Sequence, residues 1–234
     1  MQEIERVDRL AKAANKVQKV LLRITPGVEA HTHEAISTAH EDVKFGFSIA
    51  SGAAWKAIAE VEAASNLALE GLHCHIGSQI FESDGFILAT TRLIELAAKF
   101  RSEFNRELAE LDLGGGYGIA YLAGDKTFEP NQVMSELAAL VTKECARHDL
   151  KIPKISIEPG RAIAGPTTTT LYEVGTVKDV LLEHGSTRRY ISVDGGMSDN
   201  IRPSLYGAEY SAVLADRLST SAHVLSRVVG KHCE

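Results

Sequence analysis

The sequence predicts an α/β fold in two parts: half of a TIM-like (β/α)8 barrel, followed by the start of an antiparallel β-domain. Short apolar runs alternate with helical patterns at intervals of about 40 to 50 residues, which is typical of βαβ units and a parallel sheet. Four such strands are half of an eight-stranded barrel, which takes about 250 residues. After Pro166 the chain becomes rich in β-branched residues with no helix between the runs, and this pattern predicts the antiparallel β-domain.

The individual elements follow from apolar spacing. The expected strands are 19–27, 67–78, 108–116 and 153–160, and the expected helices are 53–65, 86–104 and 131–148. Pro-Gly closes the first strand, and the segment 86–104 is the most strongly amphipathic helix. Met1 leads directly into a helical pattern with no strand before it, so we expect an incomplete barrel over 1–166 and a partial β-domain over 167–234.

Composition argues against several classes of protein. The formal net charge of −6 disfavours a nucleic-acid-binding surface. No apolar stretch approaches the roughly 18 residues of a membrane span, and the charged N-terminal segment has no signal-peptide core. Cys74, Cys145 and Cys233 are widely spaced and odd in number, so they form neither a zinc pattern nor a disulfide pattern and predict a reducing, cytoplasmic setting.

In a parallel α/β sheet, functional residues gather at the carboxyl ends of the strands. The third expected strand ends in Gly114, Gly115 and Gly116. Without Cβ atoms, this backbone can approach a ligand closely and point N–H groups at a phosphate. A tight turn at the end of a strand explains the same three glycines equally well.

The second expected strand ends in histidines and a small turn. His73 and His75 are two residues apart and therefore share one face of a strand. They suit a metal pair, an imidazole packed against a flat cofactor ring, or core histidines whose hydrogen bonds are satisfied. Gly77 and Ser78 follow directly, and a small turn with a hydroxyl suits a phosphate oxygen better than zinc.

Other charged groups have both a functional and a structural interpretation. Glu158, at the end of the fourth expected strand, either pairs with Arg161 or faces a ring nitrogen that it keeps protonated. Arg202 and Tyr206 suit a carboxylate ligand, although a polar surface loop explains them as well. The three histidines of 31–48 match no metal-binding helix, so we expect a solvated loop there.

Six segments of the chain, in order, resemble the fold type III pyridoxal-phosphate decarboxylases, and among these the diaminopimelate decarboxylase family most closely. The segments are "GVEAHTHEAISTAHEDVKFGFS", "GLHCHIGSQI", "LDLGGGYGIAY", "IEPGRAIAG", "VDGGMSDNIRPSLYGAEY" and the final "HCE". A set of this length and order is highly specific. The resemblance implies a homodimeric lyase of lysine biosynthesis with active sites shared between subunits. Its cofactor is pyridoxal phosphate, and its reaction converts meso-diaminopimelate into L-lysine and CO2.

The resemblance also implies how the cofactor is held. His75 resembles the residue that stacks on the cofactor ring. Ser78 and the glycines 114–116 resemble the phosphate-binding residues, with the backbone of Arg161 close by. Glu158 resembles the partner of the pyridine nitrogen, a contact that strengthens the ring as an electron sink.

The implied substrate contacts come from later in the chain. Arg161, Arg202 and Tyr206 resemble the residues that hold the distal carboxylate of the substrate, and Glu234 resembles the residue that binds its distal amino group. Cys233 resembles the catalytic acid, which acts across a dimer interface. Two arginines and a tyrosine beside one glutamate suit meso-diaminopimelate, whereas ornithine and arginine have no distal carboxylate.

The chain departs from the family in two respects: the family's cofactor lysine lies upstream of every matched segment, and the C-terminal tyrosine that completes the family's site lies beyond Glu234. Lys154 stands at the start of its strand, the wrong end, and Lys44 lies in a segment that does not carry the family's lysine. The resemblance therefore implies the middle of the enzyme, with the C-terminal half of the cofactor-binding barrel over 1–166. We expect the chain by itself to be inactive or nearly so.

Two other functions remain open on the residues alone. A metal-dependent hydrolase would use His73 and His75, but it needs further ligands at the later strand ends, which carry glycines and Glu-Pro-Gly-Arg instead. A non-catalytic decarboxylase-like protein would act by pairing with a complete subunit.

Overall fold

The structure is a computed structural model that describes residues 1–28, 44–126, 128–183 and 185–232. The chain divides into two compact units, one of Met1–Ile119 with Lys126–Pro166 and one of Ala120–Asp125 with Thr167–Glu234. Most of the histidine-containing segment 31–48, expected to be a solvated loop, lies outside the described residues, as do Cys233 and Glu234.

The first unit is built on a five-stranded sheet with the order β2-β1-β3-β4-β5. The strands are β1 (Gln18–Thr25), β2 (Phe47–Ser48), β3 (Leu67–His73), β4 (Glu110–Asp112) and β5 (Lys154–Ser156). All four pairings are parallel, which confirms the predicted α/β class with a parallel sheet. Strand β2 was not expected, because two residues are too few to show an apolar period.

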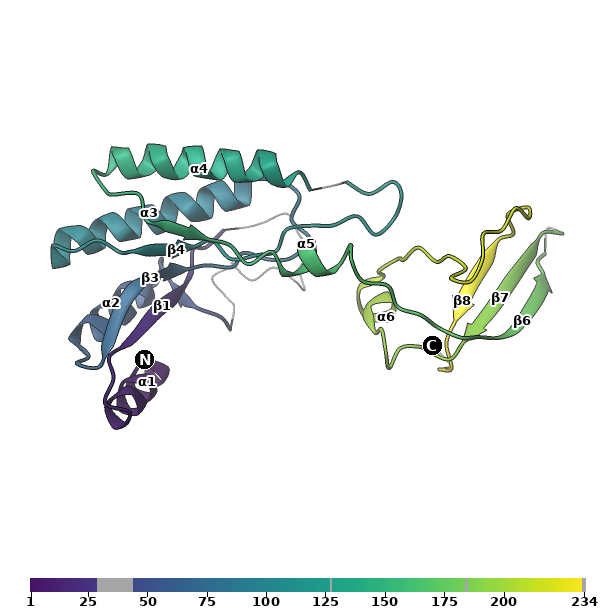
Figure 1. Ribbon diagram of the computed structural model, residues 1–234, viewed down its shortest axis with the longest axis horizontal. Coiled ribbons are helices and arrows are strands. Elements are labelled where there is room, and N and C mark those ends of the chain that lie inside the picture. The colour runs from purple at the N-terminus through teal and green to yellow at the C-terminus, as the bar shows by residue number, and fades with distance from the viewer. Residues whose placement is uncertain (29–43, 127, 184, 233–234) are drawn as a thin grey trace. The chain divides into compact units, whose positions relative to one another are not determined.

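In the described part of this unit, the helices that accompany these strands are α1 (Gln2–Ala13), α2 (Ala53–Ala63), α3 (Asp84–Phe104), α4 (Pro130–Arg147) and the short α5 (Gly160–Ala164). In the first unit, α3 and α4 lie side by side (Figure 1). Helix α3 buries Phe86, Leu93 and Phe100, seven residues apart, so one stripe of the helix is apolar along its length. It ends at Asn105, whose left-handed backbone stops the helix.

The strands are shorter at their carboxyl ends than the sequence predicted. Strand pairing continues one residue further, where Cys74 N donates to Asp112 O at 2.9 Å and Leu113 N donates to Ser156 O at 2.9 Å. Gly114 then takes a φ of 70°, which turns the chain away from the sheet. The expected site residues beyond these points therefore stand on loops, where backbone direction is set by turns and not by a strand's alternation.

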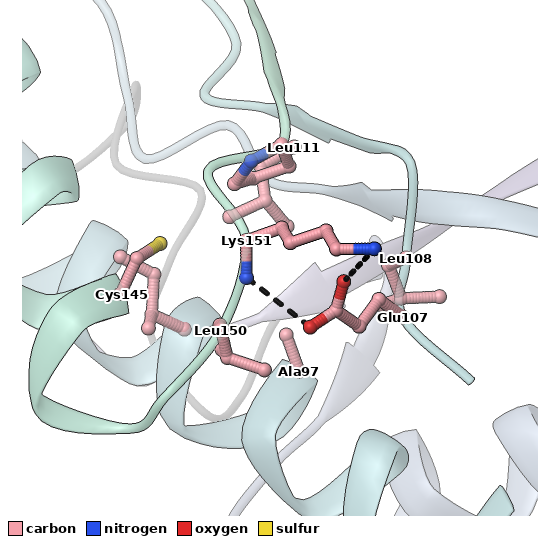
Figure 2. A pocket seen from close by; sticks show the side chains of 9 residues that line it. Ala97, Glu107, Leu108, Leu111, Cys145, Leu150 and Lys151 are labelled. Atoms are coloured by element: carbon pink, nitrogen blue, oxygen red, sulfur yellow. Dashed lines mark hydrogen bonds and ion pairs between the residues drawn. The ribbon is translucent and has the colours of Figure 1, made fainter. Parts of the chain in front are cut away.

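A small cavity of about 10 Å³ lies near the amino ends of β4 and β5, lined in part by Leu111 of β4 and Cys145 of α4 (Figure 2). Glu107 also lines it and accepts a hydrogen bond from the backbone N of Lys151 at 3.1 Å. The volume suffices for about one water molecule. Because the loops at the carboxyl ends of the strands lie at the other end of the sheet, this cavity is separate from the predicted functional residues.

The second unit contains β6 (Val174–Leu181), β7 (Thr187–Val193), the short helix α6 (Arg202–Tyr206) and β8 (Ser226–Val229). Strands β6 and β7 are antiparallel, as expected for the start of an antiparallel β-domain, whereas β8 pairs with β7 in parallel and departs from that expectation. The long connection between β7 and β8 gives the chain room to return in the same direction. Among the described residues, no helix has the length and apolar character needed to cross a membrane.

We expect Gly71→Ala to destabilise the first unit, because a Cβ on this residue of the central strand β3 would lie 1.9 Å from the carbonyl oxygen of Glu110. Overpacking of this kind costs about 2–3 kcal/mol of unfolding free energy. Gly160→Ala is the matched control, since a Cβ there meets no atom within 4 Å. Urea unfolding of both variants measures the difference, and equal midpoints would contradict the prediction.

Candidate cofactor site

Three loops at the carboxyl ends of β3, β4 and β5 are joined by backbone hydrogen bonds. Ile80 N donates to Gly116 O at 2.9 Å, and Gly118 N donates to Ile80 O at 2.9 Å, which ties the loop after β3 to the loop after β4. Glu158 N donates to Gly114 O at 2.8 Å, which ties in the loop after β5. The side chains on these loops are therefore held by one continuous backbone framework.

The three consecutive glycines allow this framework to close. A Cβ on Gly114 would lie 2.1 Å from Cys74 O, one on Gly115 would lie 2.2 Å from Glu158 O, and one on Gly116 would lie 2.2 Å from Gly77 O. Gly116 also has a φ of 103°, a conformation that side chains disfavour. Each glycine thus packs its backbone directly against the backbone of a neighbouring loop, a stronger requirement than a simple turn imposes.

His75 faces this glycine segment, and its surroundings favour the neutral form of the imidazole. Its Nδ1 accepts a hydrogen bond from Gly115 N at 3.3 Å, which leaves the ring proton on Nε2. Burial lowers the pKa of His75 below its ordinary value, and the nearby positive charge of Arg23 lowers it further. An uncharged ring suits packing against a flat aromatic ligand.

Arg23 is a residue that the sequence reasoning missed. It lies near the carboxyl end of β1, directly opposite His73 in the strand pairing, and its guanidinium is 4.6 Å from the centre of the Phe45 ring. The signal was available, because the same rule that selected the ends of the other strands applies to β1. Arg23 adds a positive charge to the edge of the sheet where the glycines and His75 stand.

Glu158 is held by a histidine rather than by the arginine considered from the sequence. His73 Nε2 lies 3.1 Å from Glu158 Oε2, whereas Arg161 Nη2 donates to Ser78 Oγ at 3.0 Å. These two bonds are found in place of the Glu158–Arg161 pair considered from the sequence. Strand register brings His73 close to the end of β5, and α5 directs Arg161 toward the loop after β3.

A compact group of metal-capable side chains surrounds His73. One ligand atom each from His73, Asp112 and Glu158 lies within 4.8 Å of the others, and His75 is not part of the group. The His73–His75 metal pair suggested by the sequence is therefore not the arrangement found, since His73 ends β3 and His75 lies on the loop beyond it. Asp112 Oδ1 already accepts a hydrogen bond from Gly114 N at 2.9 Å.

The substrate-binding residues predicted in the second unit lie on its short helix α6. Arg202 and Tyr206 stand one turn apart on α6, with the guanidinium 5.4 Å from the centre of the Tyr206 ring. Arg202 Nε also donates to the hydroxyl of Tyr210 at 3.0 Å. These contacts present a guanidinium and two phenols together, a combination suited to a carboxylate.

The residues of the first unit fit a flat, phosphorylated cofactor. The glycine segment offers backbone without side chains, Ser78 offers a hydroxyl beside the Arg161 guanidinium, and His75 offers a neutral ring. Glu158 offers a carboxylate on the neighbouring loop. A parallel α/β sheet with such a cluster at the carboxyl ends of its strands defines an α/β protein that binds a phosphorylated cofactor.

Comparison with known proteins identifies the family. Residues 1–165 match the family model described as the pyridoxal-dependent decarboxylase, pyridoxal binding domain. The chain belongs to this family of pyridoxal-dependent decarboxylases. The cofactor expected from the sequence, pyridoxal phosphate, is thereby confirmed.

The most similar curated relatives include diaminopimelate decarboxylases. The chain is 55% identical to that of Corynebacterium efficiens, over 100% of this chain and 51% of the relative. It is 55% identical to that of Mycobacterium tuberculosis, over 100% of this chain and 53% of the relative. The chain thus spans about half the length of the curated relatives it matches.

Solved structures of the same kind share the fold. A diaminopimelate decarboxylase from Helicobacter pylori complexed with L-lysine superposes with a TM-score of 0.82 at 26% identity, covering 100% of this chain and 54% of that one. A diaminopimelate decarboxylase from M. jannaschii in co-complex with L-lysine gives a TM-score of 0.84 at 28% identity, covering 100% of this chain and 51% of that one.

We expect Arg23→Gln to raise the pKa of His75 toward the ordinary histidine value, because it removes a positive charge that disfavours the protonated ring. Burial, the larger cause, remains, so the pKa stays below that value. NMR titration of the His75 ring measures the change, with Arg9→Gln on α1 as the control. An unchanged or lowered pKa in Arg23→Gln would contradict the assignment.

The same shift has a consequence for stability. The folded chain binds a proton at His75 more weakly than the unfolded chain does. Stability is therefore lost as the pH falls from the unfolded value of about 6.5 through the lower pKa of the folded chain.

Proposed function

We propose that the protein containing this chain uses pyridoxal phosphate to decarboxylate meso-diaminopimelate, giving L-lysine and CO2. The observation that carries the proposal is the joining of three loops by the glycines 114–116, which brings His75, Ser78 and Glu158 to one edge of the sheet. The names of the curated relatives and the L-lysine in two related structures support the choice of substrate and product.

In this proposal the loops divide the binding of the cofactor between them. His75 packs its neutral ring against the cofactor ring. The N–H groups of Gly114 and Gly115 already donate to Asp112 and His75, so we assign the phosphate contacts to the Gly116 N–H and the Ser78 hydroxyl. The guanidinium of Arg161 bonds Ser78 and adds positive charge beside the phosphate.

Glu158 faces the pyridine nitrogen and keeps its proton in place. When bound, pyridoxal phosphate supplies the electron sink that accepts the electrons left by the departing CO2. A carboxylate opposite the ring nitrogen favours the protonated ring, because opposite charges a few ångströms apart stabilise one another.

The substrate would be selected by charge at its distal end. We assign its distal carboxylate to Arg202 and Tyr206 together with Arg161, and its distal ammonium to Glu234. Cys233 is the proposed proton donor. A pocket with two guanidinium groups leaves the single cationic end of ornithine or arginine opposite like charges, and this repulsion discriminates against both.

The architecture of the whole protein is part of the proposal. We propose that this parallel sheet belongs to the C-terminal half of a (β/α)8 barrel, with 1–166 as part of the cofactor-binding domain and 167–234 as part of a β-domain. The edge strands β2 and β5 would then pair with further strands of a longer protein. We further propose a cytoplasmic homodimer whose active sites are shared between its subunits.

We also propose that these 234 residues alone do not decarboxylate, since none of their lysines is matched to the family's cofactor lysine. Lys154 stands at the start of β5 and bonds Glu110 at 3.1 Å, at the opposite end of the strand from Glu158. The same observation favours a second candidate function, that of a non-catalytic chain that pairs with a complete subunit.

The proposed substrate is tested by assaying the full-length protein, loaded with pyridoxal phosphate, on meso-diaminopimelate, ornithine and arginine in parallel. We expect CO2 and L-lysine from meso-diaminopimelate, with kcat/KM at least about 100-fold above the other two, because a mismatched buried charge is costly. Faster CO2 release from ornithine or arginine would refute the proposed substrate.

The role of lysine is tested on the 234-residue chain by borohydride reduction in the presence of pyridoxal phosphate, followed by peptide mapping. We expect no specific lysyl adduct. Stoichiometric labelling of one lysine would show that the chain carries its own cofactor lysine and would overturn the proposed inactivity. Co-purification of the chain with a full-length homologue tests the pairing function, and a strictly monomeric chain argues against it.

A further inference from the structure

We propose that His73 is a positioning residue that holds the Glu158 carboxylate in the orientation that faces the cofactor's ring nitrogen. The inference rests on the proposed function and assigns a role to a side chain that the proposed cofactor contacts do not use. Its basis is the 3.1 Å contact between His73 Nε2 and Glu158 Oε2, which joins residues 85 positions apart in the sequence.

His73 stands on the most constrained part of the sheet. It is the last residue of β3, a strand that pairs with β1 on one side and β4 on the other, and it lies directly opposite Asp112. Its side chain is only 15% exposed. Asp112, the other carboxylate of the group, is anchored by Gly114 N. The backbone of His73 is therefore held by strand pairing on both sides, which fixes where the imidazole begins.

Glu158, in contrast, needs an external support. It follows β5 on a loop, and its side chain is 54% exposed. A carboxylate on a flexible stem samples several rotamers unless a hydrogen bond fixes one of them. Because a carboxylate only accepts hydrogen bonds, His73 Nε2 is the donor in this contact.

The bond to His73 leaves Glu158 able to perform its proposed task. His73 engages Oε2, so Oε1 remains available to accept the N–H of a protonated pyridine ring. An oriented carboxylate stabilises the proton on the ring nitrogen through a charge-assisted hydrogen bond. The consequence is that loss of the His73 donor weakens the protonation of the ring.

The experiment measures the protonation of the cofactor's ring nitrogen directly. Pyridoxal phosphate labelled with 15N in the ring is bound to the full-length protein, and its 15N chemical shift reports whether that nitrogen carries a proton. The variants are Glu158→Gln, His73→Asn and His73→Gln. Glutamine places an amide N–H near the position of the imidazole Nε2, whereas the shorter asparagine does not, so the two form a matched polar pair.

We expect a protonated nitrogen in the wild type and in His73→Gln, and a signal in His73→Asn displaced toward that of Glu158→Gln. We also expect kcat to fall about tenfold or more in His73→Asn, with little further loss when Glu158→Gln is added, because both changes remove one hydrogen-bonded unit.

Three outcomes would overturn the inference. A His73→Asn signal identical to that of the wild type means that Glu158 is oriented without His73. Stoichiometric zinc in the wild type that is lost in His73→Asn means that the group formed with Asp112 is a metal site. Failure of the wild type to bind pyridoxal phosphate removes the proposed function and this inference together, whereas the first two outcomes leave the proposed function standing.

Discussion

The close approach of three loop backbones at Gly114, Gly115 and Gly116 is the contact on which the rest of the site depends. Each glycine lies where a Cβ would come within 2.1–2.2 Å of a carbonyl oxygen on a neighbouring loop. Such overlap cannot be relieved by rotating a side chain, so any larger residue would separate the loops. Separation would carry Glu158 and the glycine backbone away from His75 and Ser78 and dissolve the cluster proposed to bind the cofactor.

Charge at this edge of the sheet is arranged around two histidines in different environments. His75 lies beside the glycines, where burial and Arg23 lower its pKa and so favour the neutral ring. A ring nitrogen of His73 lies within 4.8 Å of a carboxylate oxygen of Asp112 and of Glu158. One imidazole is thereby suited to packing against a ring and the other to donating a hydrogen bond to a carboxylate, although only one residue separates them in the sequence.

The spacing of apolar residues along the sequence predicted the helices well. The helices expected over 53–65, 86–104 and 131–148 occur within two residues of those bounds, because each has a sustained apolar stripe. The predicted ends of the strands were less accurate, because backbone pairing and the turn at Gly114 determine where the strands end. The rule that function gathers at strand ends found the residues of the cluster, but it could not supply the Glu158–His73 bond, which joins distant elements and depends on strand register.

A crystal structure of the full-length protein with pyridoxal phosphate tests the central claim most directly. The account predicts the phosphate against Ser78 and the Gly116 N–H, the ring packed on His75, and the ring nitrogen facing the free oxygen of Glu158. A phosphate bound away from the glycine segment, or a ring nitrogen facing away from Glu158, would contradict it.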